Sequence, residues 1–379
     1  MPSPLSNAVP STKAPSGGYT GWNLTKLNPC PLNAYCLGWG FCGTTDKFCT
    51  DGKNGCISNC GIDIVNNDDA LDNFYHVAYF KVFNLKRECL NMDVNKISDT
   101  SLTHVHFAFA GLTADFDISF NTDKYESQFE KFRYRDVVKS GNREKFAKNI
   151  KAFFEKYDGL DGIDFDWEYP GATDIPGVPA GSDSDDDNYL SFLKLMKSTI
   201  NYNNAYADKG CPSGDCLRSH VNKTETINSL AMITKAGVPA SKIFVGVSSY
   251  GRSFGMVDLT CTGPMCKYGG GFDVSTTEAG TYTNTSGYIL NAELNLIIQG
   301  VDSNATNYKG RTWYDEDSAS DIMVYGTKGE ITTWVAYMSD DTKEARIDWV
   351  KGLNFGGVTD WAIDLQKLNL GVDPDSDEA

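Results

Sequence analysis

The alternation of apolar and charged residues is most regular between Asp161 and Pro170, which read D-G-I-D-F-D-W-E-Y-P. In a β-strand, Asp164, Asp166 and Glu168 would face one side, and the apolar residues between them would face the other. Three neighbouring carboxylates repel one another unless their face opens on water, a cation or a reaction centre. The pattern therefore predicts a strand whose apolar face is packed, as in a barrel covered by helices. A solvated edge strand and a calcium loop are the alternatives, although an EF-hand needs its glycine and closing Glu at other offsets.

Helical periodicity appears in four segments of the chain. Apolar stripes predict helices over residues 145–157, 188–200, 223–236 and 341–352. The acidic run 182–187 precedes the second of these helices. Such a run could bind a cation, but capping of the helix N-terminus is the favoured interpretation.

Six cysteines lie close together near the N-terminus, at positions 30, 36, 42, 49, 56 and 60. This density indicates a disulfide-stabilised module that is too small to have a core of its own. A zinc site is the alternative, but no histidine lies among these cysteines. The cysteines at 211 and 216, and those at 261 and 266, sit in short loops that each suit a local bridge. Cys89 is then the odd one of eleven cysteines.

Residues 161–168 resemble the D-x-x-D-x-D-x-E signature of glycoside hydrolase family 18, the chitinases and their relatives. The sequence is most similar to that of the fungal killer-toxin-like members. Residues 75–80, 104–110, 243–254 and 355–364 resemble the first, second, seventh and eighth strands of that family's barrel. The resemblance implies an α/β fold with a TIM-type barrel over residues 74–368. It also implies a small α+β insertion over about 255–333.

The resemblance implies an endo-acting chitinase that uses no cofactor and no metal. Glu168 would protonate the glycosidic oxygen, and the N-acetyl carbonyl of the substrate would act as nucleophile, with retention of configuration. Asp166 would orient the acetamido group with help from Tyr169, and repulsion from Asp164 and Asp166 would keep Glu168 protonated. The further substrate-binding residues are expected to be Trp361, Tyr250, Arg252 and Trp334.

Residues 29–60 resemble a hevein-like chitin-binding module, placed between a linker over 1–28 and an acidic connector over 61–73. Its sugar platform would consist of Trp39, Phe41 and Phe48. The resemblance implies the bridges Cys30–Cys42 and Cys56–Cys60, and it leaves Cys36 and Cys49 to pair with each other. The local bridges expected farther along the chain are Cys211–Cys216 and Cys261–Cys266.

Three strands of the expected barrel have no counterpart in the sequence. Between Ala114 and Asn142, where the third strand belongs, only residues 115–120 alternate, and the family's Ser-x-Gly-Gly is absent. Between Tyr169 and Lys242 there is neither a fifth strand nor a sixth strand with Met-x-Tyr-Asp. Because strand number, tilt and stagger are linked in a barrel, loss of strands 3, 5 and 6 should prevent ordinary closure. A catalytically impaired chitin-binding protein or a killer-toxin-like subunit therefore stays open as the alternative function.

Composition adds the cellular setting. The chain has 379 residues, a net charge of −16 and 41% apolar residues, which suits one large domain and one small one. An acidic surface disfavours nucleic acid, and chitin is uncharged. The cysteines predict an oxidising, extracellular or cell-wall location, with glycosylation sequons at Asn23, Asn222, Asn284 and Asn304 as a weak second signal. Residues 1–18 show no signal peptide, and no segment is long enough to span a membrane. We expect a monomer that binds chitin and chitin oligosaccharides.

Overall fold

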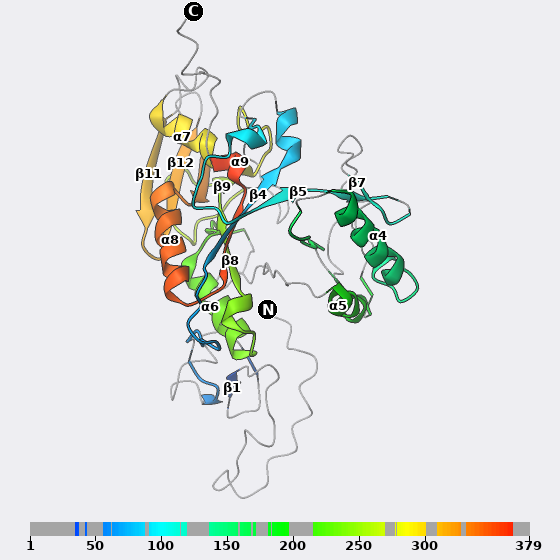
Figure 1. Ribbon diagram of the computed structural model, residues 1–379. Coiled ribbons are helices and arrows are strands. Elements are labelled where there is room, and N and C mark those ends of the chain that lie inside the picture. The colour runs from blue at the N-terminus through cyan, green and yellow to red at the C-terminus, as the bar shows by residue number, and fades with distance from the viewer. Residues whose placement is uncertain are drawn as a thin grey trace, which may run out of the picture.

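The computed structural model describes residues 35–37, 42–43, 56–61, 63–87, 91–113, 115–119, 136–157, 160–167, 170–171, 181–182, 184–196, 215–269, 277, 279–300, 309–326 and 331–366. Two large sheets form the main body of this part of the chain, and a lobe with two helices lies beside them (Figure 1). The mixture of parallel and antiparallel sheets with covering helices confirms the predicted α/β class.

A parallel four-stranded sheet lies at the centre of the body, in the order β5-β4-β14-β8. Its strands are β4 (Tyr75–Lys81), β5 (His104–Ala108), β8 (Phe244–Ser248) and β14 (Gly357–Trp361). Each coincides with a segment that resembles the first, second, seventh or eighth strand of the barrel. Since all four strands are parallel, their carboxyl ends meet at one edge of the sheet, where TIM-barrel enzymes place their active sites.

Close packing at the start of β14 explains one of its glycines. A Cβ atom at Gly357 would lie 2.0 Å from the carbonyl oxygen of Tyr75 on the neighbouring β4. A glycine is therefore required for the two backbones to approach at this register position.

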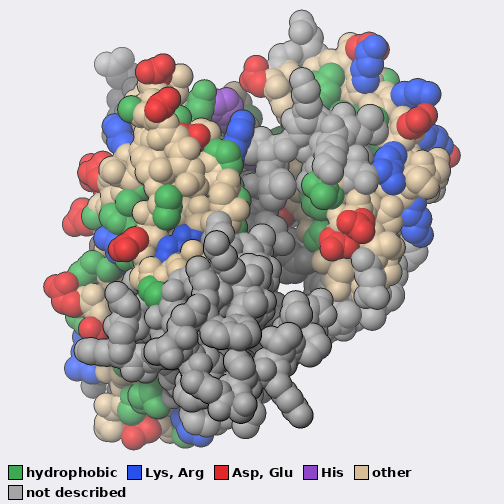
Figure 2. Space-filling model, turned by 90° about the horizontal axis from the view of Figure 1, so that it is seen from below, with side chains coloured by type: hydrophobic (Ala, Val, Ile, Leu, Met, Phe, Trp, Pro, Cys, Tyr) green, Lys and Arg blue, Asp and Glu red, His purple; other side chains and the backbone are tan. Residues whose placement is uncertain are grey.

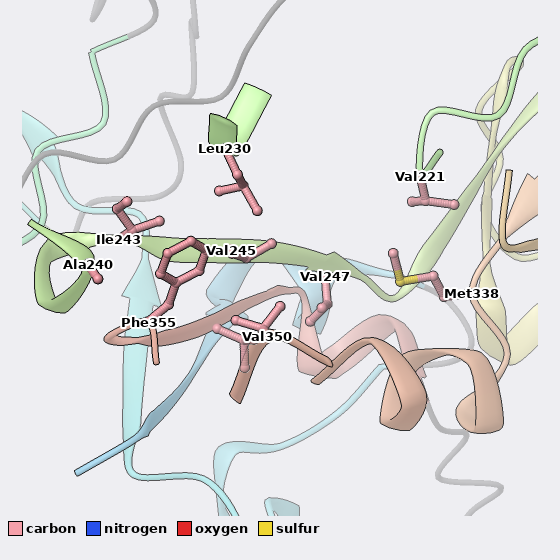
Figure 3. Packing of buried hydrophobic residues seen from close by; sticks show 10 residues of the cluster. Val221, Leu230, Ala240, Ile243, Val245, Val247, Met338, Val350 and Phe355 are labelled. Carbon is pink, nitrogen blue, oxygen red and sulfur yellow. The ribbon is translucent and has the colours of Figure 1, made fainter. Parts of the chain in front are cut away.

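Helices α6 (Lys223–Lys235) and α8 (Asp340–Gly352) pack against the parallel sheet and match two of the predicted helices. Asn222 caps α6 by accepting hydrogen bonds from the N–H groups of Thr224 and Glu225, and Ser339 caps α8. Their apolar stripes meet the sheet in the cluster of Figure 3, where the labelled residues are Val221, Leu230, Ala240, Ile243, Val245, Val247, Met338, Val350 and Phe355.

The second sheet is antiparallel, in the order β10-β9-β13-β12-β11. Its strands are β9 (Tyr250–Gly255), β10 (Tyr288–Leu290), β11 (Lys309–Asp315), β12 (Ser320–Gly326) and β13 (Thr333–Tyr337). Helix α7 (Asn291–Gln299) follows β10 and packs against this sheet. It corresponds to the expected insertion but begins earlier, at Tyr250. The predicted single strand over 243–254 was wrong in its second half. At Ser249 the chain leaves the parallel sheet, and β9 pairs with β10 and β13 instead.

The lobe beside the sheets contains helices α4 (Arg143–Lys156) and α5 (Asp185–Met196) (Figure 1). The bounds of α4 lie within two residues of those predicted, whereas α5 begins three residues before its predicted start. Its core consists of Val137, Val138, Phe146, Ile150 and Trp167. Asp185, Asp186 and Asp187 of the acidic segment 182–187 form the first turn of α5, as the capping interpretation predicts. The alternating residues near 118 form β7 (Ile118–Ser119), which pairs antiparallel with β6 (Gly111–Leu112) and is not part of the parallel sheet.

A small antiparallel sheet near the N-terminus has the order β2-β1-β3, with strands β1 (Tyr35–Leu37), β2 (Cys42–Gly43) and β3 (Cys56–Ser58). The end of the module and the connector that follows are both bonded to α6: Lys235 Nζ donates a hydrogen bond to the carbonyl oxygen of Asn59 (3.1 Å). Asn67 Nδ2 likewise donates to the carbonyl oxygen of Thr234 (2.8 Å). The small sheet therefore lies beyond the amino ends of the parallel strands, at the α6 end of the molecule (Figure 1).

The remaining short elements are the 3₁₀ helices η2 (Val82–Lys86), η3 (Val94–Lys96) and η5 (Ala240–Lys242) and the helix α9 (Ile363–Gln366). Among the described residues, no helix combines the length and apolar character needed to cross a membrane. On the face shown in Figure 2, acidic and basic side chains are interspersed over the described surface.

Candidate functional site

Asp164 lies next to the carboxyl ends of β4 and β5. The Tyr79 hydroxyl of β4 donates a hydrogen bond to Asp164 Oδ2, and His106 Nδ1 of β5 lies 3.4 Å from the same oxygen. Burial by itself would raise the pKa of Asp164, but the contacts with His106 and Tyr79 hold that pKa below its usual value. Asp164 is therefore ionised at neutral pH.

The segment around Asp164 keeps the predicted packing of Phe165 and Trp167, but Ile163 is exposed, and the segment is not the predicted strand. Residues 160–167 have no regular secondary structure and no ladder partner in the described part of the chain. Phe165 and Trp167 pack in the core of the lobe, together with Phe146 and Ile150 of α4 (the α4 cluster). The Tyr189 hydroxyl of α5 donates a hydrogen bond to the carbonyl oxygen of Phe165 (2.9 Å). Asp166 is exposed on the opposite side. The packing of Phe165 and Trp167 determines the side to which Asp164 and Asp166 point, but a strand also needs a neighbouring backbone, and none lies beside this segment within the described ranges.

Trp361 ends β14 and is surrounded by aromatic rings. Its ring centroid is 5.2 Å from that of Tyr79 and 5.4 Å from that of Phe109, which is stacked at 24°. Tyr79 therefore contacts both Trp361 and Asp164. Phe109 was not predicted, although it directly follows β5 in the stretch that resembles the second strand.

Tyr250 and Arg252 lie in the first half of β9, and Tyr250 packs against the same hydrophobic cluster as Trp361. The Tyr250 ring is 4.7 Å from that of Tyr288 and 5.1 Å from that of His220, and the Arg252 guanidinium is 5.7 Å from the Tyr250 ring centroid. Burial, followed by the charge of Arg252, lowers the pKa of His220 to about 3. His220 is consequently neutral at neutral pH.

Trp334 lies elsewhere. It is 3% exposed, packs against Phe254 in the core of the antiparallel sheet, and donates its indole N–H to the carbonyl oxygen of Thr262 (3.1 Å). The structure therefore does not bring this predicted substrate-binding residue to the group around Trp361.

Lys81, Arg87 and Asp364 form a charged cluster next to Trp361 that the sequence analysis missed. Arg87 Nη2 contacts Asp364 Oδ2, and Lys81 Nζ lies 3.8 Å from the same oxygen. The backbone N–H of Lys81 donates to Asp364 Oδ1 (3.2 Å). The available signal was periodicity, because Lys81 follows Tyr79 by two residues and so shares its face of β4.

Several predicted site residues lie outside the described residues. These are Glu168 and Tyr169 of the family 18-like motif, Trp39, Phe41 and Phe48 of the module, and Cys30, Cys49, Cys89 and Cys211. The predicted Cys261–Cys266 bridge is present, with an S–S distance of 1.98 Å, and Cys60 and Cys216 are also disulfide-bonded. Within the described ranges, no group of three or more His, Cys, Asp or Glu residues could hold a metal ion.

Comparison with known proteins identifies a family and several relatives. Residues 124–211 and 206–366 match glycosyl hydrolases family 18. A "Probable chitinase LysM11" of Penicillium expansum is 68% identical over 460 residues, a match that covers 100% of this chain and 38% of that protein. A "Secreted chitinase LysM12" of the same organism is 39% identical over 452 residues (97% of this chain, 29% of that protein). The "Killer toxin subunits alpha/beta" of Kluyveromyces lactis are 29% identical over 403 residues (89% and 33%). The chain thus spans 38% or less of the length of these relatives.

Solved structures agree on the fold. The second catalytic domain of an Ostrinia furnacalis Group II chitinase superposes with a TM-score of 0.58 at 19% identity, over 77% of this chain and 90% of that one. Human YKL-39, described as a pseudo-chitinase with retained chitooligosaccharide binding, gives a TM-score of 0.55 at 17% identity (77% and 93%). Together with the family match, which extends over more than half of the sequence, these findings show that the chain belongs to glycosyl hydrolases family 18.

Proposed function

We propose that this chain binds chitin and hydrolyses its β-1,4 linkages between N-acetylglucosamine units. The observation that carries the proposal is the linked group of Asp164, Tyr79 and Trp361 at the carboxyl ends of the parallel strands. This group combines an ionised carboxylate with an aromatic floor, which suits a sugar ring that develops positive charge at its anomeric carbon. Relatives named as chitinases support the same substrate.

The proposed reaction is retaining and substrate-assisted. Glu168 donates its proton to the glycosidic oxygen as the bond from that oxygen to the anomeric carbon breaks. The acetamido oxygen of the same sugar bonds to the anomeric carbon and forms an oxazolinium ion, which Asp166 stabilises and Tyr169 helps to position. Water then attacks the anomeric carbon, the bond from that carbon to the acetamido oxygen breaks, and the water gives a proton back to Glu168. The charge on Asp164 supports this cycle, because like-charge repulsion favours the protonated form of Glu168.

We infer that the barrel lacks strands 3, 5 and 6. Two observations support this inference. The described parallel sheet contains only the strands that resemble the second, first, eighth and seventh, in that order. The match with LysM11 extends over 460 residues, whereas this chain has 379, and the match to the family is divided into two segments that meet near residue 206. The relative therefore has internal segments without a counterpart here.

The loss of the sixth strand bears on activity. That strand would carry the Tyr-Asp pair that holds the acetamido group, and removal of one such preorganised group typically costs about 10²–10³ in rate. A chitin-binding protein with little turnover is therefore the second candidate function. For the N-terminal region we propose a chitin-binding module over residues 29–60, and for the protein an extracellular or cell-wall location.

The test is release of sugar from chitin oligosaccharides by the purified chain, with a Glu168→Gln variant alongside. Glu168→Gln keeps the shape of the side chain and removes the proton, so turnover should fall by about 10²–10⁴ while binding changes little. Equal turnover in the two proteins would overturn the catalytic assignment. Binding without turnover in the unmodified chain would establish the second candidate function, and absence of binding would refute both.

A further inference from the structure

Lys81 is a buried lysine on the site-facing side of β4. It is 6% exposed, and its Nζ lies 5.8 Å from the ring centroid of Trp361 and 5.8 Å from that of Tyr288. Tyr79, two residues earlier, contacts the same Trp361 from the Asp164 side. Lys81 and Asp164 therefore act on the aromatic floor from two different sides.

The ammonium of Lys81 has few partners for a buried charge. Its Nζ donates to the Tyr288 hydroxyl at 3.4 Å and is 3.8 Å from Asp364, whose carboxylate is already held by Arg87. Among the described residues, two cations thus share one buried carboxylate, which gives this part of the cluster an excess positive charge. Burial, with Arg87 adding to it and Asp364 opposing it, lowers the pKa of Lys81 to about 8. Lys81 is still protonated in neutral and acidic solution.

Positive charge also lies at the far side of the aromatic group. The guanidinium of Arg252 stands 5.7 Å from the Tyr250 ring, and its field contributes to the lowered pKa of His220. The carboxylate of Asp164 lies on the Tyr79 side. A sugar placed on Trp361 would therefore have this carboxylate on one side and cations on the other.

We propose that Lys81 is a specificity-determining residue, which disfavours binding of deacetylated, positively charged glucosamine units over the aromatic floor at Trp361. The proposal rests on the proposed function, because it concerns the sugar that chitin would place in this site. The carboxylates needed for the reaction attract any cation. Lys81 offsets that attraction without opposing an uncharged N-acetylglucosamine unit.

The proposed chemistry gives this selection a purpose. A glucosamine unit has no acetamido oxygen, so it cannot supply the nucleophile of a substrate-assisted reaction. If it occupied the floor at Trp361, it would block the site without reacting. Coulomb's law, with a separation of about 10 Å and an effective dielectric constant of about 20, gives a discrimination on the order of tenfold.

The experiment measures dissociation constants of two probes, the tetramer of N-acetylglucosamine and its fully deacetylated counterpart, by calorimetry at about pH 5.5. The full chain carries Glu168→Gln so that the acetylated probe is not consumed, and Gln has the same charge as the protonated acid. Lys81→Met removes the charge and keeps most of the stem volume. Lys81→Arg keeps the charge, and Lys351→Met removes an exposed charge of α8 as a matched control.

We expect Lys81→Met to bind the deacetylated tetramer about tenfold more tightly, with affinity for the acetylated tetramer unchanged within about twofold. Lys81→Arg and Lys351→Met should keep the original ratio of the two constants. If Lys81→Met does not fold, as judged by circular dichroism, Lys81→Gln takes its place. An unchanged ratio in the uncharged variant, or an equal fall in Lys81→Arg, would overturn this inference alone. If the Glu168→Gln protein with Lys81 unchanged failed to bind the acetylated tetramer, the proposed function would be overturned as well.

Discussion

Lys343 of α8 is the centre of a buried polar network below Trp361. Its Nζ donates hydrogen bonds to Ser249 Oγ (2.6 Å), Asp360 Oδ2 (3.0 Å) and Gln366 Oε1 (2.7 Å). The network reaches Trp361 on two sides, because Asp360 precedes it in β14 and the backbone N–H of Ser249 donates to its carbonyl oxygen (2.9 Å). Lys343 and Asp360 are only 8% and 7% exposed, so their charges depend on each other.

We predict that Lys343→Met lowers the free energy of unfolding by about 3–5 kcal/mol, the usual cost when one partner of a buried ion pair is removed. After the change, Asp360 keeps the Ser249 hydroxyl as a donor (2.6 Å) but has lost its countercharge. The double variant Lys343→Met with Asp360→Leu should recover most of the loss, since no unpaired buried charge remains. Lys351→Met, on the exposed side of the same helix, should change stability by no more than about 0.5 kcal/mol.

The assay is urea unfolding followed by tryptophan fluorescence and far-ultraviolet circular dichroism. With a slope of about 3 kcal/mol per molar urea, Lys343→Met should move the midpoint down by roughly 1–1.7 M. Two results would refute the reasoning: a midpoint for Lys343→Met equal to that of the Lys351→Met control, or a double variant no more stable than the single one. Either would mean that the ion pair does not stabilise the fold through its buried charge.

Three further predictions concern the cysteine module and Asp164. Peptide mapping of the oxidised protein should recover Cys36 linked to Cys49, and free thiols at both positions, or Cys36 linked to Cys89, would contradict the pairing. Trp39→Ala should weaken retention on chitin beads by about 1–3 kcal/mol, the scale of one aromatic stacking contact, and unchanged retention would exclude Trp39 from the platform. Asp164 has a lowered pKa in the folded state, so its contribution to stability is present above its unfolded pKa of about 3.9 and is lost as the pH falls through the folded value. The melting temperatures of the unmodified chain and of Asp164→Asn should accordingly differ at pH 7 and converge below about pH 4, and a gap that persists in acid would argue against this linkage.

The elements that the sequence predicted well are those with a local signal. Strand β4 and helix α8 begin and end within one or two residues of their predicted bounds, because apolar periodicity and capping residues act over a few neighbouring positions. The antiparallel sheet was predicted only as an α+β insertion. Its early start depends on Ser249, which bonds to Trp361 in another part of the chain, and no periodicity within 243–254 reveals that contact.

Periodicity could have placed Lys81 on the same face of β4 as Tyr79, but the pairing of Lys81 with Asp364 could not be predicted from the sequence. Lys81 and Asp364 are 283 residues apart, and nothing in either local stretch marks the other as its partner. A lysine at the end of an otherwise apolar strand is equally consistent with a solvated strand end. Only the parallel pairing of β4 with β14 brings the two residues together and makes the lysine a buried charge.

Residues 160–167 show how a motif can keep its side-chain contacts without belonging to a sheet. Side-chain alternation is a property of one extended segment, and Phe165 and Trp167 maintain it by packing into the α4 cluster. Membership of a sheet requires a second backbone beside the first, and residues 160–167 have no such partner within the described ranges. Asp164 nevertheless contacts Tyr79 and His106, because the packed apolar residues and the carboxyl ends of β4 and β5 determine its position. A carboxylate site can therefore persist when neighbouring strands are lost, whereas groups carried by those strands cannot. Family resemblance in the motif thus bears on the proton donor, and turnover depends also on the acetamide-binding groups of the strands inferred to be missing.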